Sequence, residues 1–194
     1  MPKLGMEPIR RAALVKATID EIGATGTLDV TVSQIAKRAG MSTALAHHYF
    51  GGKTQIFLAA MRHILAVYAD EVHAALATAD GPLARLEAVV RAGFASSNFR
   101  PEVVGAWLNF YVLAQSSLDA QRLLDIYQRR LHSNLVHDLR PLVGDRADQA
   151  AARIAGLIDG LYLRRGLQQS AHFDLPAADH VLALLRAELK GTTT

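Results

Sequence analysis

The sequence contains no cysteine among its 194 residues. Without thiols the chain forms no disulfide, no thiolate zinc site and no cysteine nucleophile, and this composition is typical of a reducing compartment. Long apolar runs are also missing: the longest strongly apolar stretch, residues 103–114, contains Asn109 and is shorter than the roughly 20 residues that span a bilayer. The first eleven residues lack the apolar core of a signal peptide. We therefore expect a cytoplasmic protein that does not associate with membranes.

Strand patterns are nearly absent as well. Apolar residues recur at intervals of three and four, and Ala, Leu and Arg are frequent, which is typical of amphipathic helices. The pattern predicts an all-α fold of about nine helices, at residues 8–24, 32–39, 43–49, 53–77, 82–97, 102–115, 118–141, 146–169 and 175–190. We expect a three-helix domain over residues 1–52 and a larger helical domain over residues 53–194.

Motifs for catalysis and for cofactor binding are missing too. The chain has no glycine-rich phosphate loop, no paired catalytic carboxylates and no G-x-S-x-G motif. His47 and His48 are adjacent, so on a helix they point about 100° apart and chelate a metal poorly. The other histidines lack the spacing of metal ligands. We expect neither an enzyme nor a protein with a metal or cofactor.

Charge is unevenly distributed along the chain. The net charge is +3 overall, but residues 1–63 carry +4 and the remainder carries −1. Within the basic part, Lys3, Arg10 and Arg11 form a short basic arm. A basic segment of this kind favours contact with a polyanion such as DNA, although an ordinary solvated surface has the same appearance.

The stretch "TVSQIAKRAGMSTALAHHYF", residues 31–50, contains two short helical patterns separated by a turn at Gly40. Thr31 followed by Gln34 has the form of a capping box, and Ser42 is placed to cap the second helix. This is the helix-turn-helix pattern, in which the second helix enters the major groove of DNA. The same pattern occurs in helical proteins that bind no DNA. We expect the two short helices to pack on apolar residues of the preceding helix, namely Ile9, Leu14, Ile19 and Ile22.

The same segment resembles the DNA-binding segment of the TetR-type repressors. It matches the pattern I-A-x-x-A-G-x-S-x-x-x-x-x-H-x-F-x-x-K at Ile35, Ala36, Ala39, Gly40, Ser42, His48, Phe50 and Lys53. The resemblance implies that residues 42–49 form the recognition helix and that Lys53 begins a helix against phosphate. His47 stands where the family often has a tyrosine that touches phosphate. The DNA-binding residues implied are Thr31, Ser42, Thr43, Ala44, His47, His48, Tyr49 and Lys53.

Aromatic residues are scarce, with one Trp and five Tyr, yet several gather in "PEVVGAWLNFYVLAQ". Trp107, Phe110 and Tyr111 lie on one helical face there. An apolar core stripe is the ordinary interpretation of such spacing. The alternative is a cation site, because aromatic faces attract quaternary ammonium groups by about 0.5 to 2 kcal/mol per ring.

The stretch "RIAGLIDGLYLRRG", residues 153–166, is apolar on two faces, one of which carries Gly156 and Gly160. The glycines permit the close approach of another helix and predict dimerisation through residues 146–190. Asp159 has no Lys or Arg three or four residues away. If its carboxylate is buried it needs a distant partner or a bound cation, whereas a partly exposed aspartate needs neither.

The segments "AWLNFY", "LIDGLYLRRG" and "MPKLGMEPIRR" are similar to those of the choline-responsive repressors of glycine betaine synthesis within the TetR family. This similarity implies a homodimeric repressor that binds duplex operator DNA and is released by choline. Tyr127 shares a helical face with Leu124 and Leu131, so we expect it on the inward side of its own helix. The expected ligand-binding residues are Trp107, Phe110, Tyr111, Tyr127, Asp159 and Tyr162. A TetR-type regulator of another lipophilic or cationic molecule, or an architectural helical protein, are the alternatives.

Overall fold

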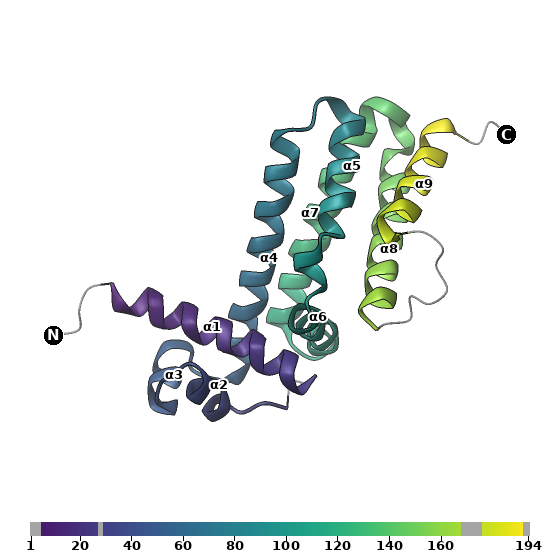
Figure 1. Ribbon diagram of the computed structural model, residues 1–194. Coiled ribbons are helices and arrows are strands. Elements are labelled where there is room, and N and C mark those ends of the chain that lie inside the picture. Colours follow the sequence, from purple (N-terminus) through teal and green to yellow (C-terminus); the bar gives the residue numbers. More distant parts are fainter. Residues whose placement is uncertain (1–4, 27–28, 168–175, 192–194) are drawn as a thin grey trace. The chain divides into compact units, whose positions relative to one another are not determined.

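A computed structural model describes residues 5–26, 29–167 and 176–191. Within these ranges the chain forms nine α-helices and two short 3-10 helices, and no strand, which confirms the all-α prediction. The helices, shown in Figure 1, are α1 (Met6–Thr25), α2 (Val32–Arg38), α3 (Thr43–Phe50), α4 (Lys53–Ala77), α5 (Gly81–Gly93), η1 (Ser96–Phe99), α6 (Pro101–Ala114), α7 (Leu118–Val143), η2 (Gly144–Arg146), α8 (Ala147–Gly166) and α9 (Ala177–Lys190). The predicted end at residue 169 and start at residue 175 lie outside the described residues.

The predicted helix 82–97 is interrupted: α5 ends at Gly93 and the separate turn η1 follows. Asn98 closes the end of α5, since its buried side-chain amide donates to the carbonyl of Ala92 at 3.0 Å, beside the backbone amide of Ala95 at 3.2 Å. The last carbonyls of a helix have no partner within that helix. Asn98 supplies one from outside, at the point where periodicity alone would have continued the helix.

Contacts divide the chain into two compact units, Met1–Ala66 with Arg100–Leu123 and Val67–Phe99 with Leu124–Thr194. The first unit therefore includes the start of α4 and all of α6, in addition to α1, α2 and α3. The predicted domain boundary between residues 52 and 53 stays a prediction, since this division follows packing and runs through α4 and α7.

The first unit has its core where α1 meets α2 and α3, which lie below it in Figure 1. Leu14, Ile22 and Ile35 are fully buried or nearly so. Ile19 is also buried, as predicted, but Ile9 is 62% exposed and does not join this core. Ile9 belongs to the first turn of α1, ahead of the part that α2 and α3 cover.

Helix α6 packs on α1 by a close crossing at two glycines of this unit. A Cβ added to Gly23 would lie 2.5 Å from Cα of Glu102 and 3.2 Å from its backbone nitrogen. At Gly105 an added Cβ would lie 3.7 Å from the carbonyl oxygen of Ile22, an ordinary contact. Asn109 also donates to the Gly105 carbonyl at 2.8 Å. Gly23 is therefore the position that permits the two helices to approach.

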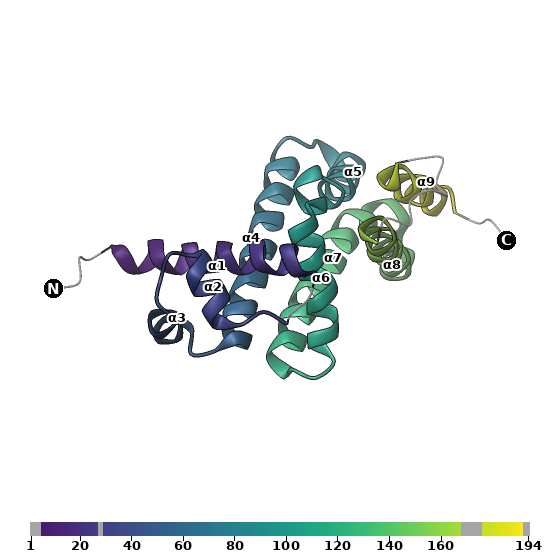
Figure 2. The same cartoon turned by 60° about the horizontal axis from the view of Figure 1, so that its bottom comes forward.

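The second unit is built on a core that includes Leu135, Leu139, Ile154 and Leu182. Helices α8 and α9 lie side by side in both views of the chain (Figure 1 and Figure 2). A bidentate ion pair joins them, with Arg153 Nη2 at 2.7 Å from Glu188 Oε2. No helix among the described residues is long and apolar enough to cross a membrane.

Candidate functional sites

Helices α2 and α3 are each closed by hydrogen bonds from their own cap residues. Gln34 N donates to Thr31 Oγ1 at 3.2 Å, and Thr31 N donates to Gln34 Oε1 at 2.7 Å, which confirms the predicted capping box. Leu45 N donates to Ser42 Oγ at 3.2 Å, so Ser42 caps α3 as predicted. Caps of this kind stabilise a helix by about 1 kcal/mol. They explain how helices of seven and eight residues persist.

The turn between α2 and α3 reverses the chain at Gly40. Gly40 has a φ of 66°, a left-handed conformation that favours glycine. The next amide, Met41 N, donates to the carbonyl of Ala36 at 2.9 Å and closes the end of α2. The two helices are thus fixed at the angle of a helix-turn-helix unit.

Helix α3 presents a polar, exposed surface to its surroundings. Ala46 is fully buried, whereas Ala44, His47 and His48 are exposed and Thr43 and Tyr49 are partly buried. A recognition helix needs such a face free of contacts with its own domain. The positions predicted to contact DNA on this helix are thus all at least partly exposed, and their contact with DNA stays a prediction.

His47 is held by the end of its own helix. Its Nδ1 lies 2.9 Å from the carbonyl oxygen of Gly51, which only accepts hydrogen bonds. Nδ1 therefore carries a proton, and in the neutral ring Nε2 is an acceptor. A neutral His47 can accept from a base amino group, while contact with phosphate requires the protonated ring.

Arg11 of α1 contacts two aromatic rings in the last turn of α3. Its Cζ lies 5.5 Å from the ring centroid of Tyr49 and 5.0 Å from that of Phe50. It also pairs with Glu7 at 2.8 Å. Arg11 thus links the predicted basic arm to α3. Arg10 is exposed, and Lys3 lies outside the described residues.

Lys53 is the first residue of α4 and is exposed. The start of a helix carries partial positive charge from unpaired backbone amides, and anions bind there. Lys53 adds a full charge at the same end. Its position fits the predicted contact with a phosphate group, which stays a prediction.

Of the six predicted ligand residues, Trp107, Phe110 and Tyr111 form one cluster on α6 in the first unit. The Trp107 ring centroid lies 5.8 Å from that of Phe110 and 5.7 Å from that of Tyr111. Phe110 also packs against Phe57 at 6.3 Å and is 0% exposed. The structure thus gives Phe110 a core position, and the ligand role of this cluster stays a prediction.

Tyr127, Asp159 and Tyr162 lie in the second unit. The Tyr127 hydroxyl donates to Asp159 Oδ1 at 3.2 Å. Burial raises the pKa of Asp159, and the hydrogen bond from Tyr127 partly opposes this shift. Tyr162 donates to the carbonyl of Asn98 at 2.8 Å, and its ring lies 4.9 Å from that of Phe99. Asp159 is thus partly buried, and the partner that the structure gives it is a neutral hydroxyl and not an opposite charge.

Sequence reasoning missed Tyr68 and Glu71, which lie beside this group on α4. The Tyr68 ring meets the Tyr127 ring edge-on, with centroids 6.2 Å apart. Glu71 accepts hydrogen bonds from the Ser97 hydroxyl at 2.6 Å and the Asn98 amide at 3.3 Å. Their spacing of three residues puts both on one face of a helix. That spacing was the signal available in the sequence.

Two open grooves lie on the surface of the second unit. One, of about 380 Å³, is lined by Gly156, Leu157, Gly160, Leu161, Arg164 and His180. A Cβ added to either glycine would meet nothing within 4 Å. Within the described part of the chain, nothing covers the glycine face of α8.

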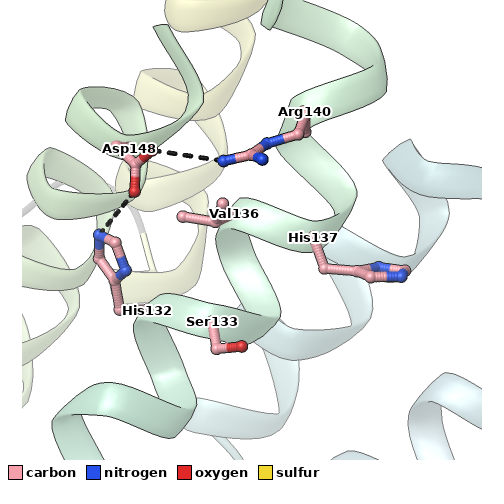
Figure 3. Close-up of a pocket in the computed structure, with 6 residues that line it drawn as sticks. All are labelled: His132, Ser133, Val136, His137, Arg140 and Asp148. Atoms are coloured by element: carbon pink, nitrogen blue, oxygen red, sulfur yellow. Dashed lines mark hydrogen bonds and ion pairs between the residues drawn. The ribbon is translucent and has the colours of Figure 1, made fainter. Parts of the chain in front are cut away.

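The other groove, of about 440 Å³, is lined by His132, Ser133, Val136, His137, Arg140 and Asp148. Figure 3 shows Asp148 between His132 and Arg140, at 4.0 and 3.5 Å, while His137 points away. Among the described residues no group of three or more metal-ligating side chains is present, here or elsewhere.

Two family models match the chain in the regions just described. Residues 14–60 match the bacterial regulatory proteins of the tetR family, and residues 82–193 match the C-terminal domain of the BetI-type transcriptional repressors. The chain belongs to the TetR family and carries a BetI-type C-terminal domain. It is a transcriptional repressor and not an enzyme, as its sequence predicted. TetR regulators bind operator DNA and small-molecule ligands, typically as dimers.

Relatives and solved structures agree with this membership. The chain is 49% identical over 186 residues to the HTH-type transcriptional regulator BetI of Brucella anthropi, covering 95% of this chain and 94% of that one. It is 48% identical over 197 residues to BetI of Rhizobium meliloti, covering 98% and 97%.

Among solved structures, a transcriptional regulator from Pseudomonas aeruginosa PAO1 superposes with a TM-score of 0.84 at 26% identity, covering 97% of this chain and 94% of that one. A regulator from Saccharomonospora viridis in complex with choline has a TM-score of 0.75 at 23% identity, covering 94% and 96%.

Proposed function

We propose that this TetR-family repressor binds operator DNA as a homodimer, controls genes for the synthesis of glycine betaine from choline, and is released by choline. The main observation that supports this proposal is the environment of Asp159. Its side chain is partly buried, its hydrogen-bond donor is the neutral Tyr127 hydroxyl, and among the described residues no Lys, Arg or His forms an ion pair with it. A buried charge without an opposite charge is costly. A ligand cation would compensate it.

Two comparisons support choline as that cation. The relatives of known name are BetI regulators, and the Saccharomonospora regulator of similar fold holds choline. Choline carries a quaternary ammonium group, which donates no strong hydrogen bond. Aromatic rings and a carboxylate are therefore the groups that recognise it, and Asp159 lies beside Tyr127 here.

DNA binding through α3 requires two copies of the chain. A helix of eight residues reaches few base pairs, so two recognition helices should occupy half-sites about 34–36 Å apart, or a multiple of that distance. The uncovered glycine groove of α8 and α9 supports dimerisation through these helices. Gly156 and Gly160 would permit the partner's helix to approach closely.

Release by choline requires that the ligand binds two conformations with different affinity. Helix α4 is the proposed transmitter. It begins at Lys53, the predicted phosphate contact, and the same helix carries Tyr68 and Glu71. A tilt of α4 on ligand binding would therefore displace Lys53 from its phosphate.

The experiment is a titration of operator binding with choline. Fluorescence anisotropy with the chain's own upstream DNA gives the affinity, and isothermal titration calorimetry gives choline binding directly. Saturating choline should weaken operator binding at least tenfold, within the usual range of coupling between two sites. Unchanged operator affinity at saturating choline would refute release by choline and leave the TetR-family membership intact.

A regulator that senses another organic cation is the second candidate, because the same partly buried carboxylate favours any cation of suitable size. A sensor of long acyl chains is disfavoured, since it needs a dry tunnel without an acid. Calorimetry with choline, glycine betaine and tetramethylammonium separates these ligands. Tight binding of another cation, with weak binding of choline, would establish this second candidate.

A further inference from the structure

In the second unit, the carboxylates of Asp159 and Glu71 both affect the pKa of Tyr68. Burial raises the pKa of Tyr68 to about 12, and the negative charges of Asp159 and Glu71 contribute to the rise. The contacts agree with this: Tyr68 and Glu71 lie one turn apart on the same helix, and the Tyr68 ring meets the ring of Tyr127, whose hydroxyl donates to Asp159. Asp159 comes from α8, and Tyr68 and Glu71 come from α4.

Neutral groups hold both carboxylates in place. Asp159 accepts from Tyr127 at 3.2 Å, and Glu71 accepts from Ser97 at 2.6 Å and Asn98 at 3.3 Å. In the described part of the chain, neither carboxylate forms an ion pair with Lys, Arg or His. Neutral donors orient a carboxylate but leave its charge uncompensated. Among the described residues no cationic side chain pairs with either acid, so a ligand cation would compensate their charge.

Aromatic rings lie near the same groups. Tyr68 and Tyr127 meet edge-on at 6.2 Å, and Phe99 lies 4.9 Å from Tyr162. The guanidinium of Arg165 lies over the Phe99 ring, 4.0 Å from its centroid. One ring of this group thus already accepts a cation on its face.

We propose that Glu71 and Tyr68 are ligand-recognition residues, which form with Asp159 and Tyr127 a site for one small quaternary ammonium ion. This rests on the proposed function and adds two residues that lie outside the six predicted from sequence. The carboxylates compensate the charge of the ion, and the tyrosine rings cover its methyl groups. Calcium or magnesium fits less well, because each requires six or more oxygen ligands or retained waters, and among the described residues no group of three or more metal-ligating side chains is present.

The test compares choline with dimethylbutanol, its uncharged carbon isostere, by calorimetry on the full-length protein. Charge recognition predicts that the wild type prefers choline at least tenfold. Glu71→Gln should lower choline affinity about tenfold, since it removes one nearby charge, and should leave dimethylbutanol affinity within twofold. The matched control is Asp70→Asn, which removes the same charge from an exposed neighbour on α4 and should leave both affinities within twofold.

Several results would overturn the assignment. Glu71→Gln could retain full choline affinity, or it could lose choline and dimethylbutanol equally, as expected of a purely structural residue. Should Glu71→Gln fail to give a folded protein by circular dichroism, Tyr68→Phe replaces it. Tyr68→Phe keeps the ring and should preserve choline affinity within threefold, whereas Tyr68→Leu removes the ring and should lower it at least fivefold.

Tetramethylammonium distinguishes failure of this site from failure of the proposed function. Tetramethylammonium affinity could depend on Glu71 as expected while choline leaves operator affinity unchanged. That result would support the proposed site and refute release of the repressor by choline. If the wild type binds choline and releases DNA without dependence on Glu71, the function stands and this site falls. If neither cation binds the wild type, both fall.

Discussion

The crossing of α1 and α6 makes Gly23 the most constrained glycine of the described chain. In Gly23→Ala the new Cβ would lie 2.5 Å from Cα of Glu102 and 3.2 Å from its nitrogen. Carbon atoms pack at about 3.5–4.0 Å, and backbone atoms cannot rotate away. The substitution must therefore move α6 by about 1 Å relative to α1.

The magnitude follows from two opposing effects. Overpacking costs about 1–3 kcal/mol, while alanine favours a helix over glycine by about 1 kcal/mol. Because the clash is with backbone atoms, we expect the upper part of the overpacking range, about 2–3 kcal/mol, and therefore a net loss of about 1–2 kcal/mol in the free energy of unfolding. For a chain of this size each kcal/mol lowers the melting temperature by about 2–4 °C, so the expected decrease is about 2–8 °C.

Thermal denaturation followed by circular dichroism measures this decrease, and the emission of Trp107, which lies on α6, reports whether the helix has moved. Gly105→Ala is the matched control. It lies at the same crossing, but its Cβ would meet the Ile22 carbonyl oxygen at 3.7 Å, so its melting temperature should equal or exceed that of the wild type. Equal melting temperatures for the two variants would refute the reasoning.

Three further outcomes follow from the proposed sites. Lys53→Ala should weaken binding to operator and to random DNA alike, and should reduce the slope of log affinity against log salt concentration by about one. His47→Ala should instead change the base preference in competition assays. Equal effects of the two variants on base preference would contradict the assignment of Lys53 to phosphate and His47 to bases. Gly160→Leu should fill the open groove of α8 and give monomers by sedimentation, and a persistent dimer would place the interface elsewhere. Since burial raises the pKa of Asp159, protons compete with a bound cation, so choline affinity should fall as pH falls through that pKa and Asp159→Asn should remove this dependence in calorimetry.

The sequence by itself determined the all-α class and the capped helix-turn-helix element. The caps at Thr31 and Ser42 were predictable because each bonds a residue three positions away. The turn at Gly40 was predictable because a left-handed φ favours glycine. Interactions of this range are encoded within a few residues, so pattern and spacing are sufficient to find them.

Only the tertiary structure decided which distant side chains meet. Tyr127 and Asp159 are 32 residues apart, and Ser97 lies 26 residues from Glu71, so no local spacing relates the partners. Helix α5 ends at Gly93, where Asn98 folds back on it, and Phe110 is buried because it packs against Phe57. Periodicity shows which face of a helix is apolar, but the element that covers that face is chosen by the packing of the whole unit.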